Sequence, residues 1–197
     1  MSPLQRIAMG LVFVIGTAPF PADPHPSWKQ YDALPDPVGW VLVLLGVHAL
    51  VRGRPHFDVL RLPALVAAVV SVAVWFPQLS HRLSDSGAWA LSLPQLAFSF
   101  LLARAIAEQG LEQEPVDTYV SKRFGLLMWG FAVLAALPPI AIGGNVTALD
   151  DVTVTAALVV NVAFVYYLFR VHRREWLGGP GPLVVEMPGN DEGRPPA

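Results

Sequence analysis

The chain has no cysteine among its 197 residues, which excludes disulfides, thiolate metal sites and thiol catalysis together. It is also poor in charge, because charged residues make up 14% of it, against roughly 25% in a typical soluble domain. Hydrophobic residues make up 54%. A soluble domain of this size needs more polar side chains to cover its surface, so the composition indicates a protein embedded in a lipid bilayer. The net charge of -2 gives no indication of nucleic-acid binding.

Six apolar segments follow one another along the chain, at residues 4–20, 37–52, 62–76, 88–106, 124–142 and 152–169. A helix of about 20 residues crosses the ~30 Å hydrocarbon core, and shorter segments can extend into their flanks or thin the bilayer. The pattern therefore predicts an all-α fold, an integral membrane bundle of six transmembrane helices within residues 1–177. The Gly- and Pro-rich residues 178–197 are expected to form a flexible cytoplasmic tail.

The first segment has a second interpretation, because its apolar run has the length found in a secretory signal peptide. Arg6 is the only basic side chain that precedes this run. A cut after Ala18 would leave proline at the new N-terminus, which makes a poor peptidase substrate. A retained first helix is therefore the favoured interpretation.

The basic residues are sorted between the two sides that six spans would create. Only Lys29 and Arg82 lie in the loops of one side, although the chain has 13 Lys and Arg residues in all. The remainder, on the other side, are Arg6, Arg52, Arg54, Arg61, Arg104, Lys122, Arg123, Arg170, Arg173, Arg174 and Arg194. Because cytoplasmic loops are enriched in Lys and Arg, we expect both termini in the cytoplasm.

The tryptophans support the same arrangement. Trp40, Trp75 and Trp89 fall at the predicted outer ends of spans two, three and four, whereas Trp129 and Trp176 fall near inner ends. Amphipathic indole rings prefer the headgroup region of a membrane. Arginine far outnumbers lysine, and Ala, Val, Gly and Pro are abundant, as in proteins of GC-rich bacteria. We therefore expect a multi-pass protein of the cell inner (plasma) membrane.

Each inward-running span begins near an aspartate, at Asp36, Asp85 and Asp151, and ends at an arginine. One interpretation is a threefold-repeated helical hairpin with a common site. The favoured interpretation is simpler, because aspartate caps helix N-termini and complements the helix dipole there, and arginine at the inner end follows from topology.

Few residues carry chemistry. The chain has no metalloprotease, hydrolase, P-loop or dinucleotide-binding motif, and no acidic residue lies inside a predicted span. An enzymatic activity is therefore the less favoured expectation, and the sequence suggests neither a cofactor nor a metal site. The polar residues within the spans are His48, Gln95 and Asn161. They form either interhelical hydrogen bonds, worth ~0.6 kcal/mol on average, or a small polar ligand site between spans two, four and six.

The inner arginines are candidates for binding anionic lipid headgroups, although topology alone would also place them there. They are Arg52, Arg54, Arg104, Arg170, Arg173 and Arg174. The expected partners are therefore the bilayer itself and either anionic lipids or another membrane protein.

The segment DPVGWVLVLLGVHAL, residues 36–50, resembles the D-x-x-G-x-x-L-x-x-x-G opening of a span in small multi-pass bacterial inner-membrane proteins of unknown function. The resemblance covers about fifteen residues and implies an uncharacterised membrane family. It implies no catalytic residue in this chain. The leading hypothesis is thus a non-enzymatic membrane protein that binds a partner, lipid or small ligand. The alternative is a small transporter or channel whose pathway lies near Asn161 and spans four and five, which Pro94, Pro138 and Pro139 are expected to kink.

Overall fold

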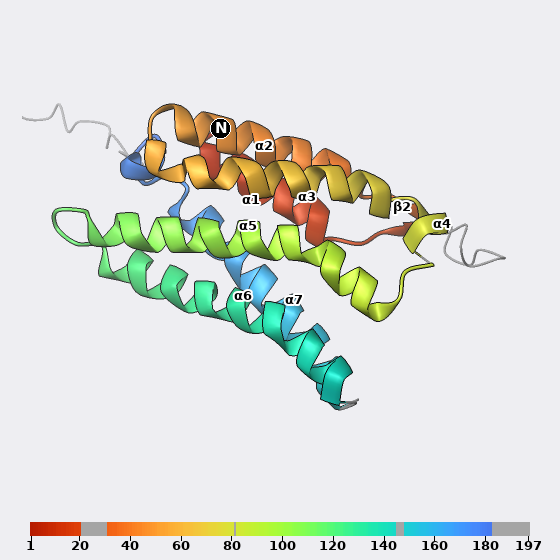
Figure 1. Ribbon diagram of the computed structural model, residues 1–197. Helices are drawn as coiled ribbons and strands as arrows, with labels where there is room; N and C mark the ends of the chain where they lie inside the picture. Colours follow the sequence, from red (N-terminus) through yellow and green to blue (C-terminus); the bar gives the residue numbers. More distant parts are fainter. Residues whose placement is uncertain (21–30, 81, 145–147, 183–197) are drawn as a thin grey trace, which may run out of the picture.

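The computed structural model describes residues 1–20, 31–80, 82–144 and 148–182, and most of these residues are helical (Figure 1). The long helices are α1 (Pro3–Ile15), α2 (Asp36–Arg52), α3 (Arg61–Val74), α5 (Asp85–Leu111), α6 (Thr118–Gly144) and α7 (Ala148–Val171). The short elements are the strands β1 (Pro19–Phe20) and β2 (Tyr31–Asp32), the helix α4 (Pro77–Ser80), and the 3-10 helices η2 (Pro55–Leu60) and η3 (Glu175–Leu177). The predicted helical bundle is confirmed.

The six long helices pack in a ring. Each contacts two neighbours in the cyclic order α1, α2, α3, α5, α6 and α7, and α7 closes the ring against α1. One end of the ring carries the start of α1, η2, the connection between α5 and α6, and η3 (Figure 1). We call it the basic end, because Arg52, Arg54, Arg173 and Arg174 lie there. The opposite end carries α4 and the two-stranded β-ladder formed by β1 and β2 (Figure 1). We call it the ladder end.

Four helical stretches are long enough and apolar enough to cross a membrane, namely Pro55–Val74, Asp85–Leu111, Thr118–Ala141 and Asp151–Val171. Only 11% to 33% of the residues in their most apolar windows are buried inside the protein. Large apolar side chains consequently face outward, and Val69, Leu126 and Val154 are 65%, 68% and 71% exposed. Water solvates such a surface poorly and lipid tails solvate it well. The exterior therefore suggests a multi-pass membrane protein.

Several helices begin or end away from the predicted span boundaries. α5 ends at Leu111 rather than at residue 106, and α6 begins at Thr118 rather than at residue 124, because each helix continues past the apolar run into polar residues. α1 ends at Ile15 rather than at residue 20, because Gly16 adopts an extended conformation and the chain continues into β1. Before α3, η2 joins the helix directly, so the apolar helical stretch begins at Pro55 rather than at residue 62. With 13 and 17 residues, α1 and α2 are about 20 and 26 Å long, which is short of the ~30 Å hydrocarbon core.

A two-stranded ladder joins the end of α1 to the start of α2. β1 and β2 pair in antiparallel fashion. The carboxylate Oδ1 of Asp32 accepts hydrogen bonds from the backbone N–H groups of Ala18, at 2.8 Å, and Leu34, at 2.9 Å. These bonds explain why α1 stops early. Lys29, one of the two basic residues assigned to this side, lies outside the described residues.

Prolines lie inside two helices without ending them. Pro94 is in α5, and Pro138 and Pro139 are in α6. Figure 1 shows that α5 bends in its first third and that this part of the helix diverges from α3. The kink expected at Pro94 therefore separates two neighbouring helices at the ladder end.

The closest helix contact lies between α1 and α2, where glycines bring the two backbones together. A Cβ added to Gly39 would lie 2.6 Å from the carbonyl oxygen of Gly10. A Cβ added to Gly46 would lie 2.6 Å from Cγ1 of Ile7 and 2.9 Å from the carbonyl oxygen of Pro3. Small residues allow this approach in membranes, where packing rather than hydrophobic exclusion holds helices together.

The variant Gly39→Ala should therefore lower the thermal unfolding temperature in detergent, because its Cβ meets backbone that cannot rotate away. We expect a loss of about 1–3 kcal/mol, as for overpacking in a tight core. Gly125→Ala in α6 is the matched control, since a Cβ there meets no atom within 4 Å and alanine favours the helix. Equal unfolding temperatures for the two variants would contradict the close contact.

Candidate functional site

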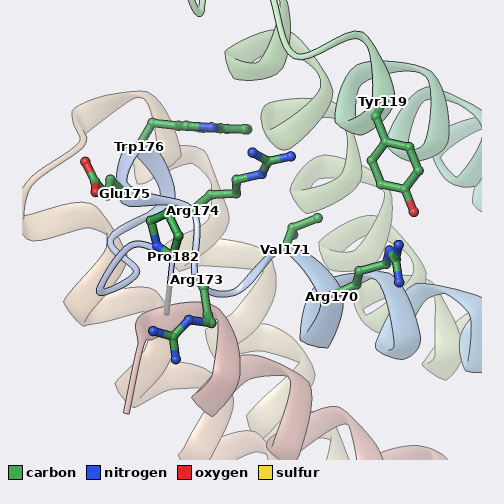
Figure 2. Close-up of a pocket in the computed structure, with 8 residues that line it drawn as sticks. All are labelled: Tyr119, Arg170, Val171, Arg173, Arg174, Glu175, Trp176 and Pro182. Atoms are coloured by element: carbon green, nitrogen blue, oxygen red, sulfur yellow. The ribbon is translucent and has the colours of Figure 1, made fainter. Parts of the chain in front are cut away.

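A cavity with a volume of about 750 Å³ lies at the basic end. Figure 2 shows the side chains that line this basic-end cavity. They come from the start of α6, the end of α7, η3 and the segment after it, and they are Tyr119, Arg170, Val171, Arg173, Arg174, Glu175, Trp176 and Pro182. Three arginines and one glutamate line the cavity, and Asp117 pairs with Arg174, so a smaller excess of positive charge remains.

The wall formed by η3 depends on a tight turn after α7. Gly178 and Gly181 have φ angles of 81° and 83°, a left-handed conformation that glycine adopts at little cost. The turn lets the backbone N–H of Gly179 donate to the carbonyl of Arg174, at 2.9 Å. These residues belong to the predicted tail, of which 178–182 are described and 183–197 lie outside the described residues.

Arg54 holds η3 in place from the other half of the ring. Its Nε donates a 2.6 Å hydrogen bond to the carbonyl of Trp176, and its Nη2 donates a 2.8 Å bond to the carbonyl of Glu175. Arg54 is therefore engaged by backbone oxygens of the cavity wall. Its role toward lipid stays a prediction.

The three cavity arginines differ in how they are held. Arg174 forms an ion pair with the largely buried carboxylate of Asp117, at 3.1 Å. Arg173 donates from Nε to the carbonyl of Gly181, at 2.9 Å. The guanidinium of Arg170 lies over the Tyr119 ring, 5.8 Å from its centroid. No carboxylate of the described chain pairs with Arg170 or Arg173 within 4.0 Å.

The orientation of these side chains divides the cavity. Figure 2 shows Arg174 and Trp176 extending toward the side on which Tyr119 and Arg170 lie, whereas Arg173 points to the opposite side. The Glu175 carboxylate points away from the guanidinium of Arg174. An anion between α6 and η3 would therefore meet Arg170 and Arg174 rather than Glu175.

The remaining predicted arginines lie apart from the cavity. Arg52 is exposed at the end of α2. Arg104 forms an ion pair with Glu108 on its own helix, at 2.7 Å. The predicted set of six thus separates into three cavity residues, one residue that positions η3, and two on the outside of the bundle.

The predicted polar residues of the spans lie in different surroundings. His48 is exposed on α2 and lines a shallow groove together with Arg61. The Asn161 amide donates from Nδ2 to the carbonyl of Ala157 in its own helix, at 2.8 Å. Gln95 lines a second cavity, which is at the ladder end.

This ladder-end cavity has a volume of about 230 Å³ and lies between α2, α3, α4 and α5. Its lining residues are Asp36, Trp40, Ala67, Val70, Ser71, Val74, Ser80, Leu83, Ala88, Leu91, Ser92 and Gln95. The contributions of α3 and α5 each follow the spacing i, i+3, i+4, i+7 of one helical face. That spacing, which places Ser92 beside Gln95 on α5, is the sequence signal that could have revealed the cavity.

Asp36 has a different role from the capping role that the sequence predicted. The N-cap of α2 is Pro35, and no side chain caps this helix. Asp36 lies in the first turn, ahead of the apolar segment 37–52, and lines the ladder-end cavity. Burial, reinforced by the carboxylate of Asp32, raises the pKa of Asp36 to about 6. In α5 the cap is Ser84, and Asp85 is exposed.

The chain matches no model of a known protein family, no curated protein sequence and no solved structure. Within residues 1–20, 31–80, 82–144 and 148–182, no group of three or more His, Asp or Glu side chains is placed to hold a metal ion.

Arg54→Ala should release η3 from the rest of the basic end, because two hydrogen bonds from a charged donor are lost. Hydrogen–deuterium exchange measured at the Glu175–Leu177 amides should accelerate roughly thirtyfold, which corresponds to about 2 kcal/mol. Arg52→Ala, two residues earlier and exposed, is the control and should leave this exchange unchanged. Unchanged exchange in both variants would show that Arg54 does not hold η3.

Proposed function

We propose that the chain is a six-span protein of the bacterial inner membrane that binds an anionic lipid headgroup at its basic end. Four helical stretches have the length and composition of membrane spans, and α1 and α2 belong to the same ring. With six spans, the basic end would face the cytoplasm, where Lys and Arg accumulate. The function is binding rather than catalysis.

The observation that carries this proposal is the pairing of two cations with two aromatic side chains in the basic-end cavity. Arg170 and Arg174 present guanidinium groups, whose planar donors match the oxygens of a phosphate. Tyr119 and Trp176 stand beside them, and such amphipathic rings favour the headgroup region. A phosphate-binding site at the basic end lies where the headgroups of the inner leaflet would be, so a lipid headgroup fits it.

The surface next to the cavity suits the rest of a lipid molecule. The side chains of Leu158, Val162 and Tyr166 on α7 are 59%, 54% and 54% exposed. They follow one another at four-residue intervals toward Arg170, so they form one stripe on the helix. An acyl chain lying along this stripe would leave its phosphate close to Arg170.

A transport pathway near spans four and five and Asn161 has less support. The Asn161 amide is already engaged with Ala157 in its own helix. The bend of α5 opens the ladder-end cavity between α5 and α3 (Figure 1). The pocket between α5 and α6 is lined by neither Pro94 nor Asn161.

Arg170→Gln should weaken the binding of phosphatidylglycerol roughly fivefold, the effect expected for one cation near an anionic headgroup. Native mass spectrometry of the protein, released from nanodiscs of phosphatidylglycerol and phosphatidylcholine, measures the bound lipid. Arg82→Gln is the control, because Arg82 is exposed near the ladder end. The proposal fails if phosphatidylcholine is retained as strongly as phosphatidylglycerol, or if the control loses as much lipid as Arg170→Gln.

A further inference from the structure

The ladder-end cavity lies far from the basic end, and its position follows from the bend of α5. Its contributions from α3 and α5 each extend over eight residues, from 67 to 74 and from 88 to 95, and the seven steps between the first and the last cover about 10 Å along a helix. Asp36 and Ala88, near the starts of α2 and α5, lie at its outer end. Ala67 and Gln95 lie deeper along their helices. Because the bend at Pro94 moves the first third of α5 away from α3 (Figure 1), the space between them stays open.

The three serines of the cavity have already used their donors. The Oγ atoms of Ser71, Ser80 and Ser92 donate to the carbonyls three residues earlier in their own helices, at 2.8, 3.1 and 2.7 Å. A hydroxyl has one hydrogen but two lone pairs. Each serine oxygen can therefore accept a hydrogen bond from a molecule in the cavity, but none can donate one without losing its present bond.

The carboxylate of Asp36 adds a charged acceptor to this lining. Within the described part of the chain, no Lys, Arg or His side chain pairs with it within 4.0 Å. The carboxylate of Asp32 nearby adds to the negative charge rather than neutralising it. The lining therefore holds a negative charge and several oxygen acceptors. The Gln95 amide is the one group of the cavity that offers both a donor and an acceptor.

The inner wall of the cavity is aromatic and rigid. Trp40 is only 1% exposed, and its ring meets that of Phe98 edge to face, with centroids 5.4 Å apart. An indole attracts organic cations through its π face and packs well against short carbon chains. Val70 and Leu91 complete the apolar part of the lining.

We propose that the ladder-end cavity binds a small organic ammonium ion, whose N–H groups donate to Asp36 and to the serine oxygens while its carbon chain lies against Trp40. An acceptor-rich lining with one carboxylate favours a ligand that is cationic and rich in donors. The volume of about 230 Å³ equals that of roughly eight water molecules at ~30 Å³ each. It therefore holds an amine of up to roughly eight non-hydrogen atoms, and it is larger than a bare metal cation requires.

The inference goes beyond lipid binding at the basic end and does not depend on it, because the two cavities share no residue. Failure of either binding experiment therefore leaves the other standing.

The test compares butylammonium with uncharged butanol and with sodium chloride, using the full chain in nanodiscs. Unfolding is followed by tryptophan fluorescence as each compound is titrated. Butylammonium should raise the unfolding temperature saturably, with an apparent Kd at least tenfold lower than that of butanol. Sodium chloride at the same concentrations should give no saturable shift.

Two variants and a matched control locate the effect. Asp36→Asn keeps the shape of the side chain and should weaken butylammonium binding at least tenfold. Asp85→Asn is the matched control, because it removes an exposed carboxylate from the first turn of α5, as Asp36→Asn removes a carboxylate from the first turn of α2. It should leave binding unchanged. Ala88→Phe keeps Asp36 and fills the outer end of the cavity, so it should also abolish the shift. It provides the test if Asp36→Asn proves too unstable to measure.

Three results would overturn the proposal. One is equal stabilisation by butanol and butylammonium, which would make the cavity merely apolar. Another is the same saturable shift with sodium chloride, which would make an inorganic cation the ligand. The third is butylammonium binding that survives in both Asp36→Asn and Ala88→Phe.

Discussion

The exterior of this bundle is apolar and suited to a hydrocarbon solvent. The rest of the structure depends on this constraint. Residues such as Val154 on α7 and Leu126 on α6 face outward, so the backbone between the two ends must satisfy its hydrogen bonds within helices. Polar chemistry is then confined to the ends of the ring. The basic-end and ladder-end cavities follow this division, one basic and one acidic, and each is built where a helix begins, ends or bends.

Contacts distant in sequence hold the ring together at both ends. At the ladder end, Asp32 fixes the connection between α1 and α2, whose backbones then meet at Gly10 and Gly39. At the basic end, Arg54 bonds to η3 across more than one hundred residues of chain. The chain after α7 is thereby held beside the start of α1, where a Cβ added to Gly178 would lie 3.1 Å from Cγ of Pro3. The η3 wall of the basic-end cavity thus forms only when the two ends of the chain come together as the ring closes.

Hydropathy predicted the positions of the helices well but not the packing around individual polar residues, for physical reasons. Apolar runs reveal where a helix crosses, and charge sorting reveals how it is oriented. A helix that is apolar on most sides gives no signal of which face meets a neighbour. The placement of His48, Gln95 and Asn161 within long helices was therefore predictable, whereas their separate surroundings were not. In the sequence, Asp36 looked like an ordinary helix cap. The cavity beside it forms because α3 and α5 diverge, and this divergence could not be predicted from hydropathy. The early end of α1 depended on pairing with residues beyond the proline-rich loop.

The central claim is that the two ends of the ring lie on opposite sides of a membrane. Because the chain has no cysteine, single cysteines can be introduced at the exposed positions Gly53 and Glu114 of the basic end and Asp85 of the ladder end. Labelling with a membrane-impermeant maleimide in sealed right-side-out vesicles tests the claim directly. Asp85→Cys should react at once, and Gly53→Cys and Glu114→Cys only after the vesicles are opened. Reaction of all three from the same side would contradict the account.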